Sequence, residues 1–253
     1  MTLPTICLYV AGIPPEPLRR ERGSYVDWFA PLLAEHPVDV ELVDGTSGAL
    51  PHDLDRFAGI VITGSPRSLT VPEPWMEAAV ELIRQAYAAR KPLLGVCFGH
   101  QLIGAAFGGS VVLNPAGWEV STCPVELSGR GARDPLFDGL PARFPVNLAH
   151  QDIVSEDTLS PLNGIELLAH TDKARVAAVA AGPAIRGVQF HPEMTGAIAR
   201  TIVETRRDVL GADARERNSA EDHPDRLLER ASDTPLGRRV FDNFIRHFAL
   251  ATS

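Results

Sequence analysis

Cysteine is scarce in this chain, and its scarcity already excludes two kinds of architecture. Three cysteines occur among 253 residues: Cys7, Cys97 and Cys123. An odd and unpatterned set of this size argues against a disulfide framework and against a zinc site. Cys7 lies in an apolar run and Cys123 in the segment TCPVEL, so we interpret both as inert packing residues. Cys97 differs from them in its neighbours.

Long apolar runs and clusters of basic residues are also missing. No stretch approaches the ~18 apolar residues of a membrane span, and the N-terminus has neither the basic start nor the cleavage site of a secretory signal. The net charge is −8 without a Lys/Arg cluster, which argues against nucleic acid or an anionic membrane as a partner. We therefore expect a cytoplasmic protein, and the length predicts a single domain over residues 1–253.

The first hundred residues alternate between apolar strands and amphipathic helices. The predicted strands are 5–12, 38–45, 57–64 and 91–97, and the predicted helices are 24–36, 72–90 and the segment FGHQLIGAAFGG behind the fourth strand. Continuously apolar strands that alternate with helices indicate a parallel sheet covered on both faces. Ser24 is the expected N-cap of the first helix. The pattern predicts a flavodoxin-like, doubly wound α/β fold.

The following segments change character. GSVVLNP, WEVSTCPVELS, FPVNLAH, ELLAHTD and RVAAVAAG are short strand patterns separated by turn residues, which predicts a small antiparallel extension on the same core. Residues 184–190 are again a buried strand, followed by a helix near 195–210. The charged stretch near 206–235 is expected to be either a helical insertion or a mobile loop. Residues 237–250 form an amphipathic terminal helix.

Cys97 lies in the pentapeptide Gly95-Val96-Cys97-Phe98-Gly99, where a predicted strand meets a helix. Glycines on both sides of a nucleophile allow a sharp turn that lifts its side chain out at the carboxyl end of the sheet. The following helix favours a thiolate, and the Phe98 N–H is a candidate oxyanion donor. The pentapeptide alone is equally typical of a packing cysteine, so the assignment depends on its partners.

A nucleophilic cysteine needs an imidazole, and the imidazole needs a carboxylate that fixes its tautomer. The segment His191-Pro192-Glu193 supplies both at the end of a buried strand. If the strands are parallel, this segment and Cys97 meet at the same edge of the sheet. An isolated HPE would more often mark a helix boundary.

The two motifs together resemble a known family. GVCFGHQ at 95–101 and GVQFHPE at 187–193 are similar in order and spacing to class I glutamine amidotransferases, and the resemblance covers most of the chain. It implies a Cys–His–Glu catalytic triad that hydrolyses the side-chain amide of glutamine through a γ-glutamyl thioester. Cys97 is then the nucleophile, His191 the general base and acid, and Glu193 the residue that orients it. No cofactor and no metal are implied.

The resemblance also implies supporting residues. Residues 62–68 resemble the glycine-rich oxyanion loop, so Gly64, Ser65 and Phe98 are the predicted oxyanion hole. The family commonly has two glycines before the proline of this loop, and the serine at position 65 carries strain if that position needs a positive φ. Gln101 matches a position that helps to hold the substrate.

Two further segments resemble stand-alone relatives and the glutaminase part of GMP synthetase. They contain Trp118 in GWE, and His150 and Asp152 in HQDIV. Aspartate and histidine are suited to the α-ammonium and α-carboxylate of a zwitterionic substrate. These three residues are predicted to bind substrate, although a packed aromatic and a hydrogen-bonded turn would give the same pattern.

The fate of the released group stays open at this point. The motif GxxxxGK[ST] is absent and no second domain is evident. One interpretation is a glutaminase that supplies ammonia to a separate synthetase partner. A second is a stand-alone γ-glutamyl peptidase, hydrolase or transferase, because the CFGHQ motif also resembles plant-type γ-glutamyl peptidases. A third is a non-catalytic binding or regulatory protein on this fold, which the presence of all three triad residues disfavours.

Overall fold

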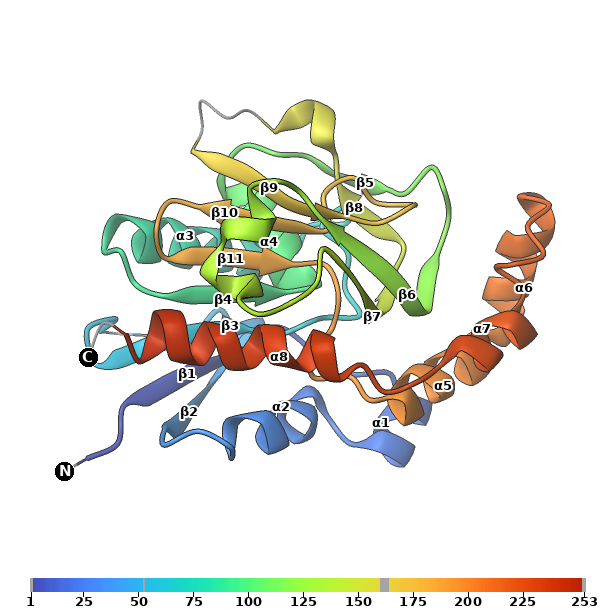
Figure 1. Ribbon diagram of the computed structural model, residues 1–253. Coiled ribbons are helices and arrows are strands. Elements are labelled where there is room, and N and C mark those ends of the chain that lie inside the picture. The colour runs from blue at the N-terminus through green and yellow to red at the C-terminus, as the bar shows by residue number, and fades with distance from the viewer. Residues whose placement is uncertain (1, 52, 160–163, 252–253) are drawn as a thin grey trace.

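The computed structural model describes residues 2–51, 53–159 and 164–251. In this part of the chain a mixed nine-stranded sheet has the order β2-β1-β3-β4-β11-β10-β9-β6-β7 (Figure 1). Its strands are β1 (Thr5–Val10), β2 (Asp39–Asp44), β3 (Phe57–Ile62), β4 (Leu93–Val96), β6 (Glu119–Leu127), β7 (Arg143–His150), β9 (Ile165–His170), β10 (Ala178–Ala181) and β11 (Ile185–Val188). The first five strands in this order pair in parallel and the others antiparallel. The predicted α/β fold with a parallel core is confirmed, and four of the strands that follow this core extend the same sheet in antiparallel orientation.

One predicted strand pairs elsewhere. β5 (Val111–Leu113) and β8 (Asp152–Val154) form a separate antiparallel pair rather than extending the central sheet. Val154 packs against α4, where its methyl groups leave no room for a Cβ at Gly104. The pair therefore covers α4 instead of joining the edge of the sheet, and it carries Asp152 toward the start of that helix.

Helices cover both faces of the parallel strands. They are α1 (Glu16–Arg22), α2 (Tyr25–Leu33), α3 (Pro74–Ala88), α4 (Phe98–Ala106), α5 (Gly196–Thr205), α6 (Arg207–Glu216), α7 (Pro224–Arg230) and α8 (Pro235–Phe244). The 3₁₀ turns Gly45–Ser47, Gly131–Arg133, Pro135–Phe137 and Glu156–Thr158 and the π-helical turn Ile245–Ala249 complete the described elements. Ser24 caps α2 as predicted, because its hydroxyl accepts from the Asp27 N–H while the Asp27 carboxylate accepts from the Ser24 N–H.

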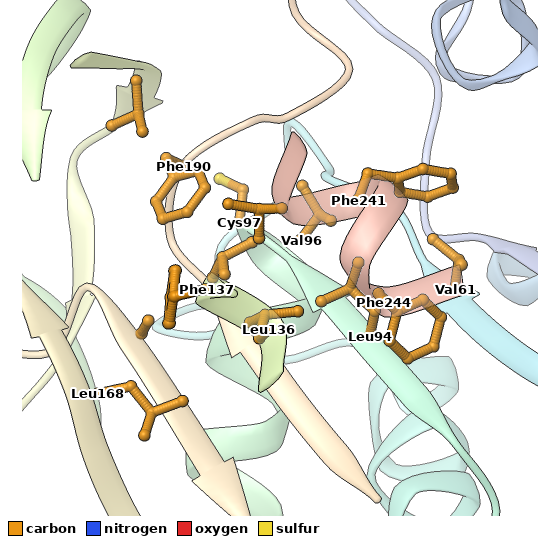
Figure 2. Close-up of a cluster of buried hydrophobic side chains, with 14 of the residues drawn as sticks. Val61, Leu94, Val96, Cys97, Leu136, Phe137, Leu168, Phe190, Phe241 and Phe244 are labelled. Carbon is orange, nitrogen blue, oxygen red and sulfur yellow. The ribbon is translucent and has the colours of Figure 1, made fainter. Parts of the chain in front are cut away.

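The core follows from the alternation of side chains along β1. Ile6 and Leu8 belong to the cluster beneath α2 and α8, whereas Cys7 and Tyr9 belong to the cluster beneath α3 and α4. Figure 2 shows part of the first cluster, in which Phe241 and Phe244 of α8 pack on Leu94 and Val96 of β4, with Cys97 and Phe190 at its border. The nucleophile candidate is thus continuous with the core.

The charged stretch near 206–235 contains α6 and α7. Together with α5 these helices extend beyond one end of the sheet (Figure 1). A third cluster joins them to α1, α2 and β6 through Leu18, Trp28, Val120, Ile198, Leu210 and Leu227. Among the described residues, no helix has the length and apolar character that crossing a bilayer requires.

Candidate active site

Cys97 occupies a strained turn between β4 and α4. Its φ is 52° and its ψ −98°, a conformation that a residue with a Cβ adopts at an energetic cost. The Cys97 N–H donates to Val188 O at 2.8 Å, and the Cys97 carbonyl accepts from the Gln101 N–H at 3.1 Å. These bonds to β11 and to the first turn of α4 hold the side chain at the carboxyl edge of the sheet.

The flanking glycines serve packing. A Cβ on Gly95 would lie 2.4 Å from the Gly99 carbonyl oxygen, and a Cβ on Gly99 would lie 2.7 Å from Ile62 O. Both obstacles are backbone atoms, which cannot rotate away. Glycine at these positions therefore lets α4 approach β3 and β4 closely, and Cys97 itself adopts the positive φ of the turn.

His191 and Glu193 form a buried pair at the same edge. β11 runs parallel to β4, with Val188 opposite Val96, so the segments that follow the two strands leave the sheet together. His191 Nδ1 lies 2.7 Å from Glu193 Oε1, and both side chains are almost fully buried. The His191 N–H donates to Asn147 O at 2.8 Å, which fixes the backbone of this segment to β7.

The surroundings of His191 favour its protonated form. Burial alone would lower the pKa of its ring, but the Glu193 carboxylate and the Cys97 side chain outweigh burial and raise the pKa of His191 to about 10. By contrast, burial raises the pKa of Cys7 and that of Cys123 to about 12. The arrangement therefore stabilises the imidazolium form of His191 beside Glu193 and Cys97.

The loop after β3 packs directly on His191 and Cys97. A Cβ at Gly64 would lie 3.0 Å from His191 Cε1 and 3.8 Å from Cys97 Cβ. Ser65 does not adopt a positive φ, so the serine found where the family commonly has glycine carries no strain of that kind. Its hydroxyl accepts from the Arg67 N–H at 3.1 Å and thereby stabilises the turn.

A cavity of about 210 Å³ opens beside Cys97. Besides Cys97, its lining includes six predicted site residues: Ser65, Phe98, Gln101, Trp118, His150 and Asp152. Pockets for drug-sized ligands measure ~300–1,000 Å³, so this one suits a smaller molecule.

His150 is engaged with the protein on both ring nitrogens. Nε2 contacts Glu119 Oε2 at 3.1 Å and Nδ1 contacts Asp152 O at 3.2 Å. The same Glu119 oxygen accepts from the Thr171 hydroxyl at 3.0 Å. His150 therefore holds the Asp152 backbone in place, which leaves Asp152 as the more accessible polar group of the two. The Asp152 carboxylate accepts from the Ser68 hydroxyl.

The sequence analysis missed Gln189, which contacts the thiol, and Asn147, which contacts the HPE segment. Gln189 Nε2 lies 3.5 Å from Cys97 Sγ, and its side-chain oxygen accepts from Gln101 Nε2 at 3.4 Å. Asn147 Nδ2 donates to Met194 O at 2.9 Å, on the far side of the HPE segment. Gln189 lies inside the second motif, so its position was a usable signal, whereas a polar residue in the β7 pattern gave none.

Arg206 was also missed. Its guanidinium lies 4.9 Å from the centre of the Trp118 ring and lines the cavity beside Cys97. The Trp118 N–H donates to Asp213 Oδ2 of α6 at 3.2 Å, so the predicted Trp118 turn and the charged helical stretch form one wall. No short motif marks an arginine of this kind.

Comparisons with known proteins show the family and the fold of this chain. Residues 22–205 match the family model for glutamine amidotransferase class-I. A glutamine-hydrolysing GMP synthase of Aeropyrum pernix is 34% identical over 192 residues, 75% of this chain and 35% of that protein, so the chain spans about a third of it. Gamma-glutamyl peptidase 4 of Arabidopsis thaliana is 26% identical over 94% of each chain. The crystal structure of a glutamine amidotransferase from Thermotoga maritima superposes with a TM-score of 0.70 at 20% identity, over 97% of this chain and 98% of that one, which shows a shared fold.

Proposed function

Because the chain belongs to the class I glutamine amidotransferase family, we propose that it cleaves the γ-amide bond of a γ-glutamyl compound through a thioester on Cys97. Glutamine is the leading substrate, and the ammonia released passes to a separate acceptor enzyme. The observation that carries this proposal is the strained Cys97 turn beside the buried His191–Glu193 pair, facing a polar cavity of about 210 Å³.

The proposed chemistry proceeds in two halves. The Cys97 thiolate attacks the γ-carbonyl carbon, and the Phe98 N–H with the Gly64–Ser65 loop stabilises the oxyanion. The C–N bond then breaks, the departing amine takes a proton from the His191 imidazolium, and a γ-glutamyl thioester remains. Water next attacks the thioester, neutral His191 accepts its proton, and glutamate leaves as the thiolate re-forms. Glu193 keeps Nδ1 of the ring occupied throughout, so the other nitrogen is the one that exchanges protons.

A second candidate is a γ-glutamyl peptidase with the same first half and a larger leaving group. The observation that favours it is coverage, because the plant peptidase matches 94% of this chain and 94% of its own length, whereas the GMP synthase match spans 35% of that protein. Such an enzyme would need no ammonia acceptor.

Product analysis of the purified chain tests both candidates. Ammonia release from glutamine is measured beside amino-acid release from γ-glutamyl dipeptides, with Cys97→Ala as the control that removes only the thiol. The proposal is supported if the native chain releases either product and the Cys97→Ala variant releases neither. An active Cys97→Ala variant contradicts it, and a native chain that binds these compounds without turnover indicates a non-catalytic role.

A further inference from the structure

Arg206 is a cation without an anionic partner beside the nucleophile. It begins the charged stretch at the junction of α5 and α6, and its side chain is partly buried. Within the ranges that the structure describes, its guanidinium forms neither a hydrogen bond nor an ion pair, and its contact is the face of Trp118 at 4.9 Å. A buried cation is unfavourable unless an anion or an acceptor compensates it. Accordingly, burial lowers the pKa of Arg206.

Neighbouring arginines, unlike Arg206, form ion pairs with carboxylates. Arg207 pairs with Asp225 at 2.8 Å and Arg217 pairs with Asp213 at 2.9 Å. Arg206 instead stacks on Trp118 and lines a cavity together with Tyr25 and Cys97. Stacking on the Trp118 ring holds the planar guanidinium while leaving its N–H edge free, which suits two parallel hydrogen bonds to a carboxylate.

Arg206 lies on the same side of Cys97 as His191, and this position indicates which part of a substrate Arg206 would contact. A second cavity, of about 30 Å³, touches both Cys97 and His191 and also reaches Arg206. His191 must give its proton to the departing nitrogen, so that nitrogen lies on this side of Cys97. The space holds little more than one small molecule such as water or ammonia. A larger leaving group therefore has to extend to the rim, where Arg206 lines both cavities.

We propose that Arg206 is a specificity-determining residue that binds a carboxylate carried by the departing amine. This inference rests on the proposed cleavage of γ-glutamyl amides in its second form, the γ-glutamyl peptidase. It names the substrate class, a γ-glutamyl amino acid or peptide whose leaving group ends in a carboxylate. Two N–H groups of Arg206 hold that carboxylate while His191 protonates the amine. No covalent bond to Arg206 forms or breaks.

The test compares γ-glutamylglycine with γ-glutamylglycinamide, which differ only in the charge of the leaving group. Loss of a charge-assisted bidentate contact corresponds to about 10- to 100-fold in kcat/KM. The native chain should prefer γ-glutamylglycine by this factor, and Arg206→Gln should abolish the preference by slowing that substrate alone. Arg207→Gln, the same change at the next residue, should keep the preference. Arg206→Lys retains the charge but lacks the planar guanidinium that donates two parallel hydrogen bonds, so it should show an intermediate preference.

The outcomes separate this inference from the proposed function. A native chain that shows no preference, or turnover of glutamine alone, overturns the role of Arg206 and leaves γ-glutamyl cleavage standing. An equal loss on both dipeptides in Arg206→Gln also overturns it, because that result indicates a structural role or a contact with the γ-glutamyl group. If the native chain cleaves neither of these two compounds and does not cleave glutamine, the proposed function itself fails.

Discussion

The contact between Gly64 and His191 allows a sharp test of how the candidate site is built. In Gly64→Ala the new Cβ lies 3.0 Å from His191 Cε1, where ordinary contacts begin at 3.4 Å, so about 0.4 Å of movement is required. The His191 ring is buried and held by Glu193 at 2.7 Å, and the movement therefore changes its position relative to Cys97. Because a misplacement of ~1 Å costs about 100-fold in rate, this shift should lower kcat roughly 5- to 10-fold.

The assay for Gly64→Ala is single-turnover formation of the γ-glutamyl thioester, followed by steady-state product release. The substitution keeps the backbone N–H at position 64, so the loss reports on the ring and not on a missing oxyanion donor. Gly129→Ala is the matched control, since a Cβ at Gly129 meets nothing within 4 Å and should leave kcat unchanged. Melting of both variants should stay within ~4 °C of the native chain, as expected for a change of about 1 kcal/mol. A native kcat in Gly64→Ala, or a loss that follows unfolding, would refute the reasoning.

Three further predictions follow from the same geometry. A glutamine-like electrophile should label Cys97 and neither of the other two thiols, whose pKa values burial raises to about 12; mass spectrometry showing equal labelling contradicts this assignment. Glu193→Gln removes a charge that helps to raise the pKa of His191 to about 10. In the pH profile of kcat/KM, the alkaline limb, where the imidazolium is lost, should therefore move to lower pH, toward 6.5. An alkaline limb that does not move argues against the pairing of His191 with Glu193. Gly95→Ala places a Cβ 2.4 Å from Gly99 O and should destabilise the fold by at least ~1–3 kcal/mol in urea titration, which a native midpoint would disprove.

The sequence predicted the features that depend on local pattern. Apolar runs placed the parallel strands, and two short motifs placed Cys97 and His191 at the ends of β4 and β11. Their meeting required the strands to be parallel neighbours, which alternation with helices indicates. β5 was expected in the antiparallel extension of the core, and its three-residue pattern carries no information about its partner. That partner, β8, lies about forty residues away in sequence.

Residues that act through contacts distant in sequence could not be predicted. Arg206 resembles any other arginine in a charged helical stretch, and only the folded chain brings it to Trp118 and Cys97. Asn147 looks like an ordinary polar residue in a strand, yet it fixes the HPE segment from two sides. His150 matched a motif, but its partner Glu119 came from another strand and decides which way its ring faces.

The left-handed backbone of Cys97 has a consequence for how such a chain evolves. A conformation of this kind destabilises a residue with a side chain by about 1–3 kcal/mol, and glycine would adopt it almost freely. Selection for stability alone would therefore drive position 97 toward glycine and remove the thiol. The position would keep cysteine only as long as selection acts on the chemistry, so a lineage that no longer needs the reaction should lose the thiol early and gain a firmer fold as it does so.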